Sequence, residues 1–368
     1  MTQPLRVLDT GVLEGRFNIA LGQALIELHQ QGDIPDTLRF LRFPPTALIG
    51  RHQVLNQEID LDFCRENDIG LVRRITGGGA IYLDSGQLGW ELVISRSSLP
   101  RKELSGLARE ICEAVVDGLQ RLGIAARFRP RNDIEVDGRK ISGTGGFFDG
   151  DTLFFQGTVL VDMDPQRMVA ALRVPRAKLQ KRSLDSAAQR VVTLRELLGD
   201  DTPDLVQIQA ALLAGISARF DFELVEDSIS GREQRLAQEF FREEIGRDEF
   251  VAEIEEPAAA RGVLTGSHTS PGGTIVTYLR LEGPAQNRVR EILVTGDFFI
   301  TPPRLVFDLE ASLRGVFLDQ IDSVIEEFFS TSPAAGLSVT AADFTAAIAA
   351  AVNTGSAVDV AADAEGKR

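Results

Sequence analysis

The sequence predicts an α+β fold built on mainly antiparallel sheets with flanking helices. Helical and strand-like segments do not alternate strictly, as they would in a parallel α/β sheet, so a dinucleotide-binding parallel sheet is not expected. Two Asp-Gly pairs, at 137–138 and 149–150, each separate strand-like runs. Asp-Gly is a strong hairpin signal because type I′ turns need positive φ at both central residues. Ahead of the hairpins, residues 104–122 carry apolar side chains three or four apart, which predicts an amphipathic helix.

The other elements before the hairpins are predicted from the spacing of apolar residues and from the glycines and prolines that end helices and strands. Residues 16–32 have apolar side chains at helical spacing and end at glycine, which predicts a helix. Residues 36–50 alternate apolar and basic residues around a Pro-Pro break, which indicates strand structure. A short helix at 60–70 then leads into a strand at 71–75, and two more strands are expected at 80–84 and 90–96.

The chain continues with a meander and then with helices. The Asp-Gly turns place antiparallel strands within 134–142 and 146–161. Apolar spacing predicts the helices that follow, at 165–174, 193–199, 203–220 and 231–246.

A change of composition after Asp248 predicts a second, smaller unit. The Gly- and Pro-rich run 265–283 and the run 288–300 are strand-like, and 309–316 and 318–329 are helical. We therefore expect a large domain at 1–246, a small C-terminal α+β domain at 247–352, and a flexible, Ala-rich polar tail at 353–368.

Composition excludes several classes of function. With 39 Lys and Arg against 54 Asp and Glu, the net charge of −15 argues against broad binding to nucleic acid or anionic membrane. No apolar run approaches the ~18 residues of a spanning helix, and no secretory signal is recognisable, so a cytoplasmic protein is expected. Two separated cysteines, Cys64 and Cys112, and three histidines suggest neither a disulfide framework nor a zinc site.

The first candidate site is the segment RRITGGGAIYLD, residues 73–84. It is not a P-loop, because the glycines run into a strand rather than a helix. Three glycines still allow backbone N–H groups to approach an anion, and Arg73 and Arg74 add forked donors. Since successive strand residues point to opposite faces, one arginine should face the ligand while the other braces the scaffold. A tight glycine turn with surface arginines is the equally open alternative.

The second candidate is RNDIEVDGRKISGTG, residues 131–145. Lys140 follows the predicted turn on a strand flanked by glycines, although an isolated lysine is ordinarily a solvated surface residue. Asn132 and Asp133 precede the strand and could bind a ribose or an ammonium group, or simply cap a turn.

Together these segments resemble the lipoate-protein ligase A family. The blocks RFPPTALIGRHQ, IGLVRRITGGGAIYLD, RNDIEVDGRKISGTGG, FFQGTVLVDMD and RAKLQKRSLDSAAQRVVTLRELL occur in the family's order and spacing. Later, GGTIVTYLRLEG, VREILVTGDFF and LEASLRGVFLD resemble the C-terminal accessory domain of the long ligases. The resemblance implies a biotin/lipoyl-ligase-type catalytic domain at 1–246 and an accessory domain at 247–352.

The resemblance also implies roles for particular residues. Lys140 matches the ligase lysine that contacts the lipoate carboxylate and the α-phosphate of ATP, and Arg74 is the ligand-facing arginine. The stretch 178–190 resembles the family's adenylate-binding loop. The implied substrate and adenylate contacts are Arg73, Arg74, Gly77, Gly78, Gly79, Ala80, Asn132, Asp133, Gly143, Thr144, Gly157, Thr158 and Lys181.

The implied activity is ATP-dependent, AMP-forming lipoate-protein ligation. Lipoate would be activated to lipoyl-AMP and transferred to a lysine of a lipoyl carrier domain, with Mg²⁺ accompanying ATP and with metal ligands unknown. The implied acceptors are the E2 subunit of a 2-oxoacid dehydrogenase, the glycine cleavage H protein or a related lipoyl-binding protein. Neither nucleic acid nor membrane is an expected partner.

Departures from the family pattern keep alternatives open. Leu83 stands where histidine is common, Gln156 stands where histidine often precedes Gly-Thr, and Arg182 replaces a glycine of the adenylate loop. One rival is an octanoyl or lipoyl transferase that takes its acyl group from a carrier thioester through a cysteine. The other is a non-catalytic lipoyl-binding protein. Cys64 and Cys112 lack the electropositive sequence neighbours of an activated thiol and are expected to be packing residues.

Overall fold

The computed structural model describes residues 3–100, 103–130, 132–173, 189–257, 262–332, 335–336 and 339–365. The chain divides into two compact units. The first comprises 1–49, 55–76 and 80–253, and the second comprises 50–54, 77–79 and 254–368. This division falls after Glu253, and it assigns two short segments from the N-terminal part of the chain to the second unit. The functional boundary at 246/247 stays a prediction.

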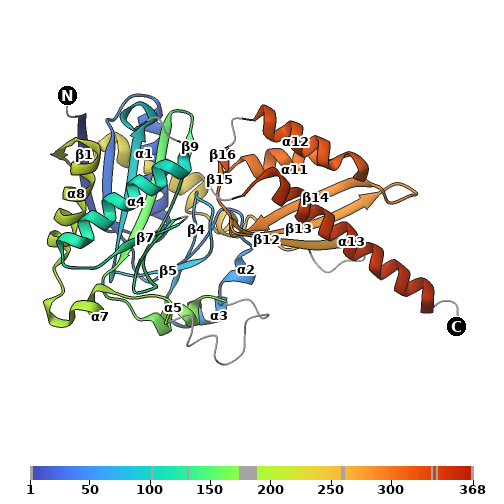
Figure 1. Cartoon of the computed structure of the whole chain (residues 1–368), viewed down its shortest axis with the longest axis horizontal. Coiled ribbons are helices and arrows are strands. Elements are labelled where there is room, and N and C mark those ends of the chain that lie inside the picture. The colour runs from blue at the N-terminus through green and yellow to red at the C-terminus, as the bar shows by residue number, and fades with distance from the viewer. Residues whose placement is uncertain are drawn as a thin grey trace. The chain divides into compact units, whose positions relative to one another are not determined.

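An eight-stranded sheet forms the centre of the first unit, in the order β11-β1-β2-β6-β10-β9-β8-β7 (Figure 1). β1 pairs in parallel with both β2 and β11, and the other neighbouring strands are antiparallel. The mainly antiparallel α+β fold is therefore confirmed. The strands are β1 (Gln3–Val12), β2 (Thr37–Arg42), β6 (Gln87–Ser95), β7 (Arg127–Arg129), β8 (Asp133–Val136), β9 (Arg139–Asp149), β10 (Thr152–Leu160) and β11 (Phe222–Glu226).

Both predicted hairpins form, but only the first has the expected Asp-Gly pair at the centre of its turn. Asp137 and Gly138 have φ angles of 51° and 78°, the left-handed values that a type I′ hairpin requires, and they join β8 to β9. In the second hairpin Asp149 is the last residue of β9, so the turn to β10 is formed by Gly150, with a φ of 56°, and Asp151. These local turns set the register that places Lys140 at the start of β9.

A small three-stranded sheet, β4-β3-β5, carries the chain into and out of the glycine segment. β3 pairs in parallel with β4 and antiparallel with β5. Its strands are β3 (Thr46–Ile49), β4 (Gly70–Arg73) and β5 (Ile81–Leu83).

Helices cover both faces of the large sheet. Trp90 and Glu91 are adjacent on β6, so their side chains point to opposite faces. Glu91 lies beside Gly22 of α1 (Gly15–Gln30), whereas Trp90 shares its face with Thr144, which contacts Cys112 of α4 (Leu104–Arg121). We refer to the two faces as the α1 face and the α4 face.

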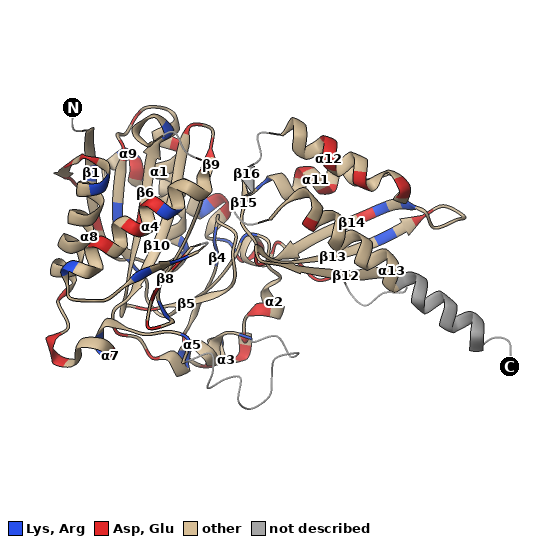
Figure 2. Cartoon of the chain, in the orientation of Figure 1, with Lys and Arg blue, Asp and Glu red and all other residues tan. Residues whose placement is uncertain are grey.

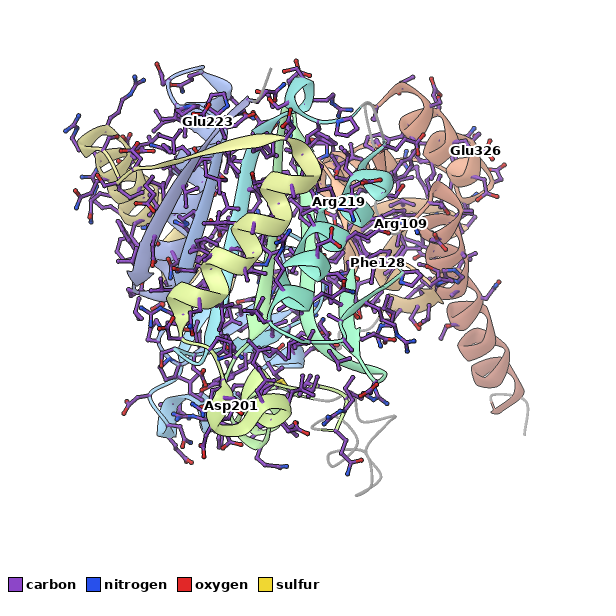
Figure 3. All side chains as sticks on the ribbon, turned by 60° about the vertical axis from the view of Figure 1, so that its left-hand side comes forward. Arg109, Phe128, Asp201, Arg219, Glu223 and Glu326 are labelled. Carbon is purple, nitrogen blue, oxygen red and sulfur yellow. The ribbon has the colours of Figure 1, made fainter. Side chains whose placement is uncertain are left out.

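The neighbours of these two helices are held by named contacts. On the α4 face, α8 (Leu205–Phe220) runs beside α4, and Arg219 of α8 pairs with Glu110, Glu113 and Asp117 of α4 (Figure 3). On the other side, α1 contacts α9 (Gly231–Phe240). The remaining helices of this unit are α2 (Leu55–Glu58), α3 (Leu61–Glu66), η1 (Arg96–Ser98), α5 (Pro165–Ala171), α7 (Leu194–Leu198), η3 (Gly199–Asp201), the π-helix η4 (Phe241–Ile245) and α10 (Asp248–Val251).

The second unit packs helices against a three-stranded antiparallel sheet, β12-β13-β14. Ile275 and Leu279 of β13 and Val294 of β14 are buried with Leu309, Ile325 and Phe344 of the helices. Its elements are β12 (Val263–Ser270), β13 (Gly273–Glu282), β14 (Arg288–Gly296), β15 (Ile300–Thr301), α11 (Leu305–Leu313), η5 (Leu318–Gln320), α12 (Ile321–Thr331), β16 (Ala335–Gly336) and α13 (Ala341–Glu365).

A buried carboxyl group closes the free edge of β14. The backbone N–H of Val294 donates to Oε1 of Glu310, on α11, at 2.7 Å. Burial raises the pKa of Glu310 to about 7, against the lowering effects of this N–H and of Arg314. The side chain therefore changes charge near neutral pH.

Glu310→Gln should make the protein more stable than wild type above pH 7. Because the folded pKa exceeds the ordinary value of 4.5, the native state holds its proton more tightly, and this stabilisation is lost as the pH rises from about 4.5 to 7. At about 1.4 kcal/mol for each pKa unit, the advantage of the variant should grow by about 2–3 kcal/mol across that window. Urea unfolding at pH 4.5 and pH 8 measures it, and a pH-independent difference would contradict the assignment.

The structure corrects two expectations. β1 and β11 were not expected, and their parallel pairing joins residues more than 200 positions apart in the sequence. The helix expected at 231–246 is α-helical only to Phe240 and continues as the π-helix η4. α13 continues through Glu365 and so overlaps 353–368, where the alanine-rich sequence favours helix, and the flexible tail expected there stays a prediction.

Charge is mixed along both units. Figure 2 shows acidic and basic residues interspersed on helices and strands. Within the part of the chain that the structure describes, no helix combines the length and the apolar character needed to cross a bilayer.

Candidate functional site

Lys140 lies at the start of β9, beside a β-bulge. Glu135 is its partner on β8, but the next pair joins Ile134 to Ser142, so the register shifts by one residue here. The backbone of Lys140 is fixed on its other side as well. Its N–H donates to the carbonyl of Arg190 at 2.8 Å, and its carbonyl accepts from the N–H of Val192 at 2.9 Å. The backbone that carries the predicted cation is therefore held from both sides.

The ammonium group of Lys140 is paired with a carboxylate. Its Nζ lies 2.7 Å from Oδ1 of Asp133, and the lysine side chain is 35% exposed. The second oxygen of Asp133 accepts from Arg129. Burial alone would raise the pKa of Asp133, but Lys140 and Arg129 outweigh it and hold that pKa below its usual value. Asp133 is thus an ionised carboxylate between two cations.

Gly143 provides the surface on which the lysine lies. A Cβ atom at Gly143 would fall 2.5 Å from Nζ of Lys140, closer than van der Waals contact permits. Gly143 is also the direct partner of Asp133 across the β8–β9 ladder. The absence of a side chain at this position lets Lys140 reach Asp133.

Gln156 shares the α1 face with this charged group. Its register partners are Gly145 on β9 and Glu91 on β6, and residues directly opposite in a sheet share a face. Its Nε2 donates to Oγ1 of Thr76 at 2.8 Å. At the position where the family often has histidine, this chain therefore places an amide bonded to the start of the glycine segment.

Other predicted residues have structural partners. Asn132 donates from Nδ2 to the carbonyl of Thr144 at 2.6 Å, and the carbonyl of Asn132 accepts from the Thr144 N–H and hydroxyl. A Cβ at Gly157 would fall 2.3 Å from the ring of Trp90, so this glycine makes room for the indole. The side chain of Thr144 points to the α4 face, away from Lys140. Thr158 pairs with Gly89 on β6.

Both arginines of the glycine segment are buried and donate to backbone carbonyls. Arg73 is fully buried, and its guanidinium donates to the carbonyls of Phe250 and Val251 at 2.8 to 3.2 Å. Arg74 is 5% exposed, and its Nη1 donates to the carbonyl of Leu48 at 3.2 Å. Burial lowers the pKa of Arg74 to about 10. Arg73 therefore braces the scaffold in this structure, and the ligand contacts expected of Arg73 and Arg74 stay predictions.

Gly77, Gly78 and Gly79 belong to the second unit, whereas the other described site candidates belong to the first. The N–H of Gly78 donates to the carbonyl of Phe298 at 3.0 Å. A Cβ at Gly78, whose φ is 90°, would lie 2.5 Å from the ring of Phe299, and one at Gly77 would lie 2.2 Å from the Phe298 carbonyl. The glycines thus admit a close approach of the chain's own Phe298–Phe299 segment.

The remaining candidates vary in what the structure says of them. Ala80 is half-buried against the cluster around Tyr82. Lys181 and Arg182, with most of the expected adenylate loop, lie outside the described residues. Leu83 is buried among Ile19, Leu48 and Val72, so at this departure from the family pattern the side chain packs in the core.

Sequence reasoning missed Arg129. It lies at the end of β7, directly opposite Asp133 of β8, the next strand along the chain. Basic residues at 127 and 129 facing acidic residues at 135 and 133 were a readable signal, because opposite charges pair across antiparallel strands.

Both cysteines are packing residues, as expected. Cys64 and Cys112 are 1% and 0% exposed. Burial, with a further effect of Asp60, raises the pKa of Cys64 to about 11. Burial also raises the pKa of Cys112 to about 12, although its contact with Thr144 opposes the shift. Neither thiol is a thiolate near neutral pH.

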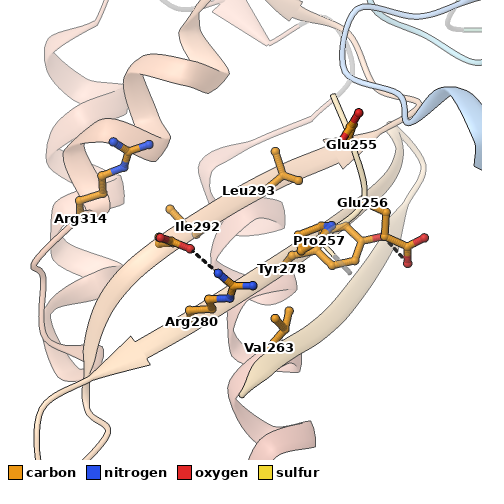
Figure 4. Close-up of a pocket in the computed structure, with 10 residues that line it drawn as sticks. Glu255, Glu256, Pro257, Val263, Tyr278, Arg280, Ile292, Leu293 and Arg314 are labelled. Atoms are coloured by element: carbon orange, nitrogen blue, oxygen red, sulfur yellow. Dashed lines mark hydrogen bonds and ion pairs between the residues drawn. The ribbon is translucent and has the colours of Figure 1, made fainter. Parts of the chain in front are cut away.

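A pocket of about 440 Å³ opens on the second unit (Figure 4). Tyr278, Leu293 and Arg280 are among the residues that line it, and Arg280 pairs with Glu291 at 3.0 Å. None of the residues predicted from the sequence lines it.

Known proteins with similar sequences indicate the family to which this chain belongs. The family model described as lipoyl protein ligase A/B catalytic domain matches residues 14–217. Lipoate-protein ligase A subunit 1 of Thermoplasma acidophilum is 31% identical over 245 residues, covering 64% of this chain and 91% of that protein. Octanoyltransferase LipM of Geobacillus kaustophilus is 27% identical over 271 residues, covering 67% and 96%.

Solved structures of lipoate-protein ligases are also similar to this chain. The bi-partite lipoate protein ligase of Thermoplasma acidophilum, described with its E2 lipoyl domain, superposes with a TM-score of 0.61 at 28% identity, covering 70% of this chain and all of that one. A lipoate-protein ligase A bound with ATP superposes with a TM-score of 0.59 at 30% identity, covering 68% and 99%. The chain therefore belongs to the lipoyl protein ligase A/B family, and its relatives include both lipoate ligases and octanoyltransferases.

Proposed function

We propose that this protein is an ATP-dependent, AMP-forming lipoate-protein ligase. The state of the cysteines supports this choice over octanoyl transfer. A transferase that holds its acyl group as a thioester needs an accessible thiolate. Cys64 and Cys112, the two cysteines of the chain, are buried and have raised pKa values.

Lys140 supplies what the ligase reaction needs. An oxygen of the lipoate carboxylate attacks the α-phosphorus of ATP, the bond to pyrophosphate breaks, and lipoyl-AMP forms. Both reactants are anions, so a positioned cation lowers the barrier by stabilising the charge that gathers around the phosphorus. Lys140, with its backbone held on both sides, is the residue we assign to this role, and Arg74 to the activated end of the ligand.

The second step is aminolysis of the mixed anhydride. The neutral ε-amine of the acceptor lysine attacks the acyl carbonyl, AMP leaves, and an amide forms. This step uses no covalent enzyme intermediate, which agrees with the absence of an activated thiol at either cysteine. The contacts assigned to Gly77, Gly78, Gly79, Asn132, Gly143 and Thr158 are part of this proposal.

Mg²⁺ is proposed to enter with ATP. Among the described residues no group of three or more acidic, histidine or cysteine side chains could hold a metal. Both oxygens of Asp133 are engaged in ion pairs. Mg²⁺ commonly uses one or two carboxylates together with substrate phosphates and water, so this donor set fits an ion carried mainly by the triphosphate, whose charge it would reduce.

The proposed acceptor is a lipoyl carrier domain, such as that of a 2-oxoacid dehydrogenase E2 or of a glycine cleavage H protein, and the proposed compartment is the cytoplasm. Two assays test the function. We expect pyrophosphate exchange into ATP that depends on lipoate, and a mass increase of one lipoyl group on an apo carrier domain. Transfer from an octanoyl carrier thioester without any exchange would establish the transferase instead, and binding with neither reaction would establish a non-catalytic role.

The double variant Cys64→Ala, Cys112→Ala should retain transfer. If neither thiol takes part, lipoylation of the carrier should stay within about threefold of wild type, although two buried side chains are shortened at a cost of about 1–2 kcal/mol in stability. Intact mass of the carrier measures transfer, and circular dichroism serves as the folding control. A folded variant that has lost transfer would overturn the assignment.

A further inference from the structure

The side chain of Lys140 lies against its own strand hairpin and remains 35% exposed. Its side chain crosses the bare backbone of Gly143, and Nζ ends 2.7 Å from Asp133. The same ammonium group is the one proposed to meet the phosphate. It must therefore leave Asp133, wholly or in part, when an anionic ligand arrives.

Asp133 does not lose its counterion when that happens. Its other oxygen accepts from Arg129, and Arg129 also lies 3.5 Å from Glu135. Glu135 in turn is 2.8 Å from Arg127. Lys140 and Arg129 thus share the carboxylate of Asp133. Asp133 therefore keeps a cationic partner whether Lys140 contacts it or has turned to the ligand.

The magnitudes favour an exchange of this kind. A partly exposed lysine–carboxylate pair contributes little net stability, so a phosphate can readily replace Asp133 as the partner of the ammonium group. Lysine has a four-carbon side chain with many rotamers, so a free ammonium group would seldom occupy the one position that the reaction needs. A partner that orients Lys140 before the ligand binds therefore improves the reaction more than its weak attraction opposes binding.

We propose that Asp133 and Arg129 are positioning residues for Lys140. Asp133 keeps Nζ oriented over Gly143 in the empty enzyme, and Arg129 retains Asp133 when Lys140 turns to the anions. This inference deepens the proposed function and rests on it. It gives Asp133 a role toward the lysine, distinct from a direct contact to the nucleotide, and it assigns a role to Arg129, which the sequence had not singled out.

Two substitutions should separate kcat from KM. Asp133→Asn removes the charge that orients Lys140, so kcat for lipoate-dependent pyrophosphate exchange should fall about tenfold, while KM for ATP changes less than threefold. Arg129→Gln leaves Lys140 as the main cation on Asp133, so the lysine is released less readily. KM for ATP should then rise about threefold or more, with kcat nearly unchanged.

Arg127→Gln is the matched control. It removes an ion pair from the same hairpin, because Arg127 lies 2.8 Å from Glu135, but it does not touch Asp133. We expect kinetics within twofold of wild type. The Asp133→Glu variant, which restores the charge, should recover part of the lost kcat.

Three results would overturn the inference. These are unchanged kcat in Asp133→Asn, equal loss in all three hairpin variants, or an Asp133→Glu variant no better than Asp133→Asn. If Asp133→Asn does not fold, the KM of Arg129→Gln against that of Arg127→Gln decides alone. Absence of exchange in the wild-type protein would instead refute the proposed function, so the two failures are distinguishable.

Discussion

Lys140→Ala should reduce lipoate-dependent pyrophosphate exchange by at least about a thousandfold. Removal of a single preorganised group that stabilises transition-state charge costs about 10²–10³ in rate in other enzymes. Here the barrier comes from bringing two anions together, so the loss should lie at the upper end. Isotope exchange at saturating ATP and lipoate measures it.

The neighbouring residue supplies the control. Arg139 is also a cation on β9, but it pairs with Glu196 on α7, an exposed contact. Arg139→Gln should leave exchange within about threefold of wild type. Near-normal exchange in a folded Lys140→Ala variant would place the cation that stabilises the phosphate elsewhere. An equal loss in Arg139→Gln would indicate a general charge effect rather than a positioned group.

Local signals account for the parts of the fold that were predicted. The turn at Asp137 and Gly138 depends on two residues that tolerate positive φ, and their identities are readable wherever they occur. The helix α4 depends on apolar residues within one segment. β1 and β11 depend on each other across more than 200 residues, and no local pattern indicates such a partner.

The candidate site also has features that local sequence predicts and features that depend on residues far along the chain. Strand alternation predicts that one of Arg73 and Arg74 is a brace, but the identity of the brace is decided by the carbonyls of Phe250 and Val251, far along the chain. The family resemblance marks the glycines, but it does not reveal that Phe299 lies against Gly78. The pairing of Lys140 with Asp133 required the bulge beside Lys140, which shifts the strand register by one residue.

The core of the first unit contains an ion pair that should be sensitive to change. Arg39 on β2 lies directly opposite Glu91 on β6, and their side chains, 0% and 4% exposed, approach to 2.8 Å under α1. Arg39 also donates to the carbonyl of Asn18 at 3.0 Å, whereas its Nε and Nη1 have no hydrogen-bond partner among the described residues. Burial raises the pKa of Glu91, and Arg39 opposes the shift. The guanidinium therefore depends on one carboxylate for its charge balance.

Glu91→Gln should lower the free energy of unfolding by about 3–5 kcal/mol, because it leaves the Arg39 charge buried without a counterion. The amide keeps the shape of the carboxyl group, so the loss reports charge rather than packing. Urea denaturation followed by circular dichroism measures it. The double variant Arg39→Met, Glu91→Leu should be more stable than Glu91→Gln alone, since removing both charges also removes the cost of keeping them dry. If Glu91→Gln lowers the free energy of unfolding by less than about 1 kcal/mol, water or a rearranged neighbour must compensate the charge of Arg39. The ion pair would then contribute no more to stability than the other contacts under α1.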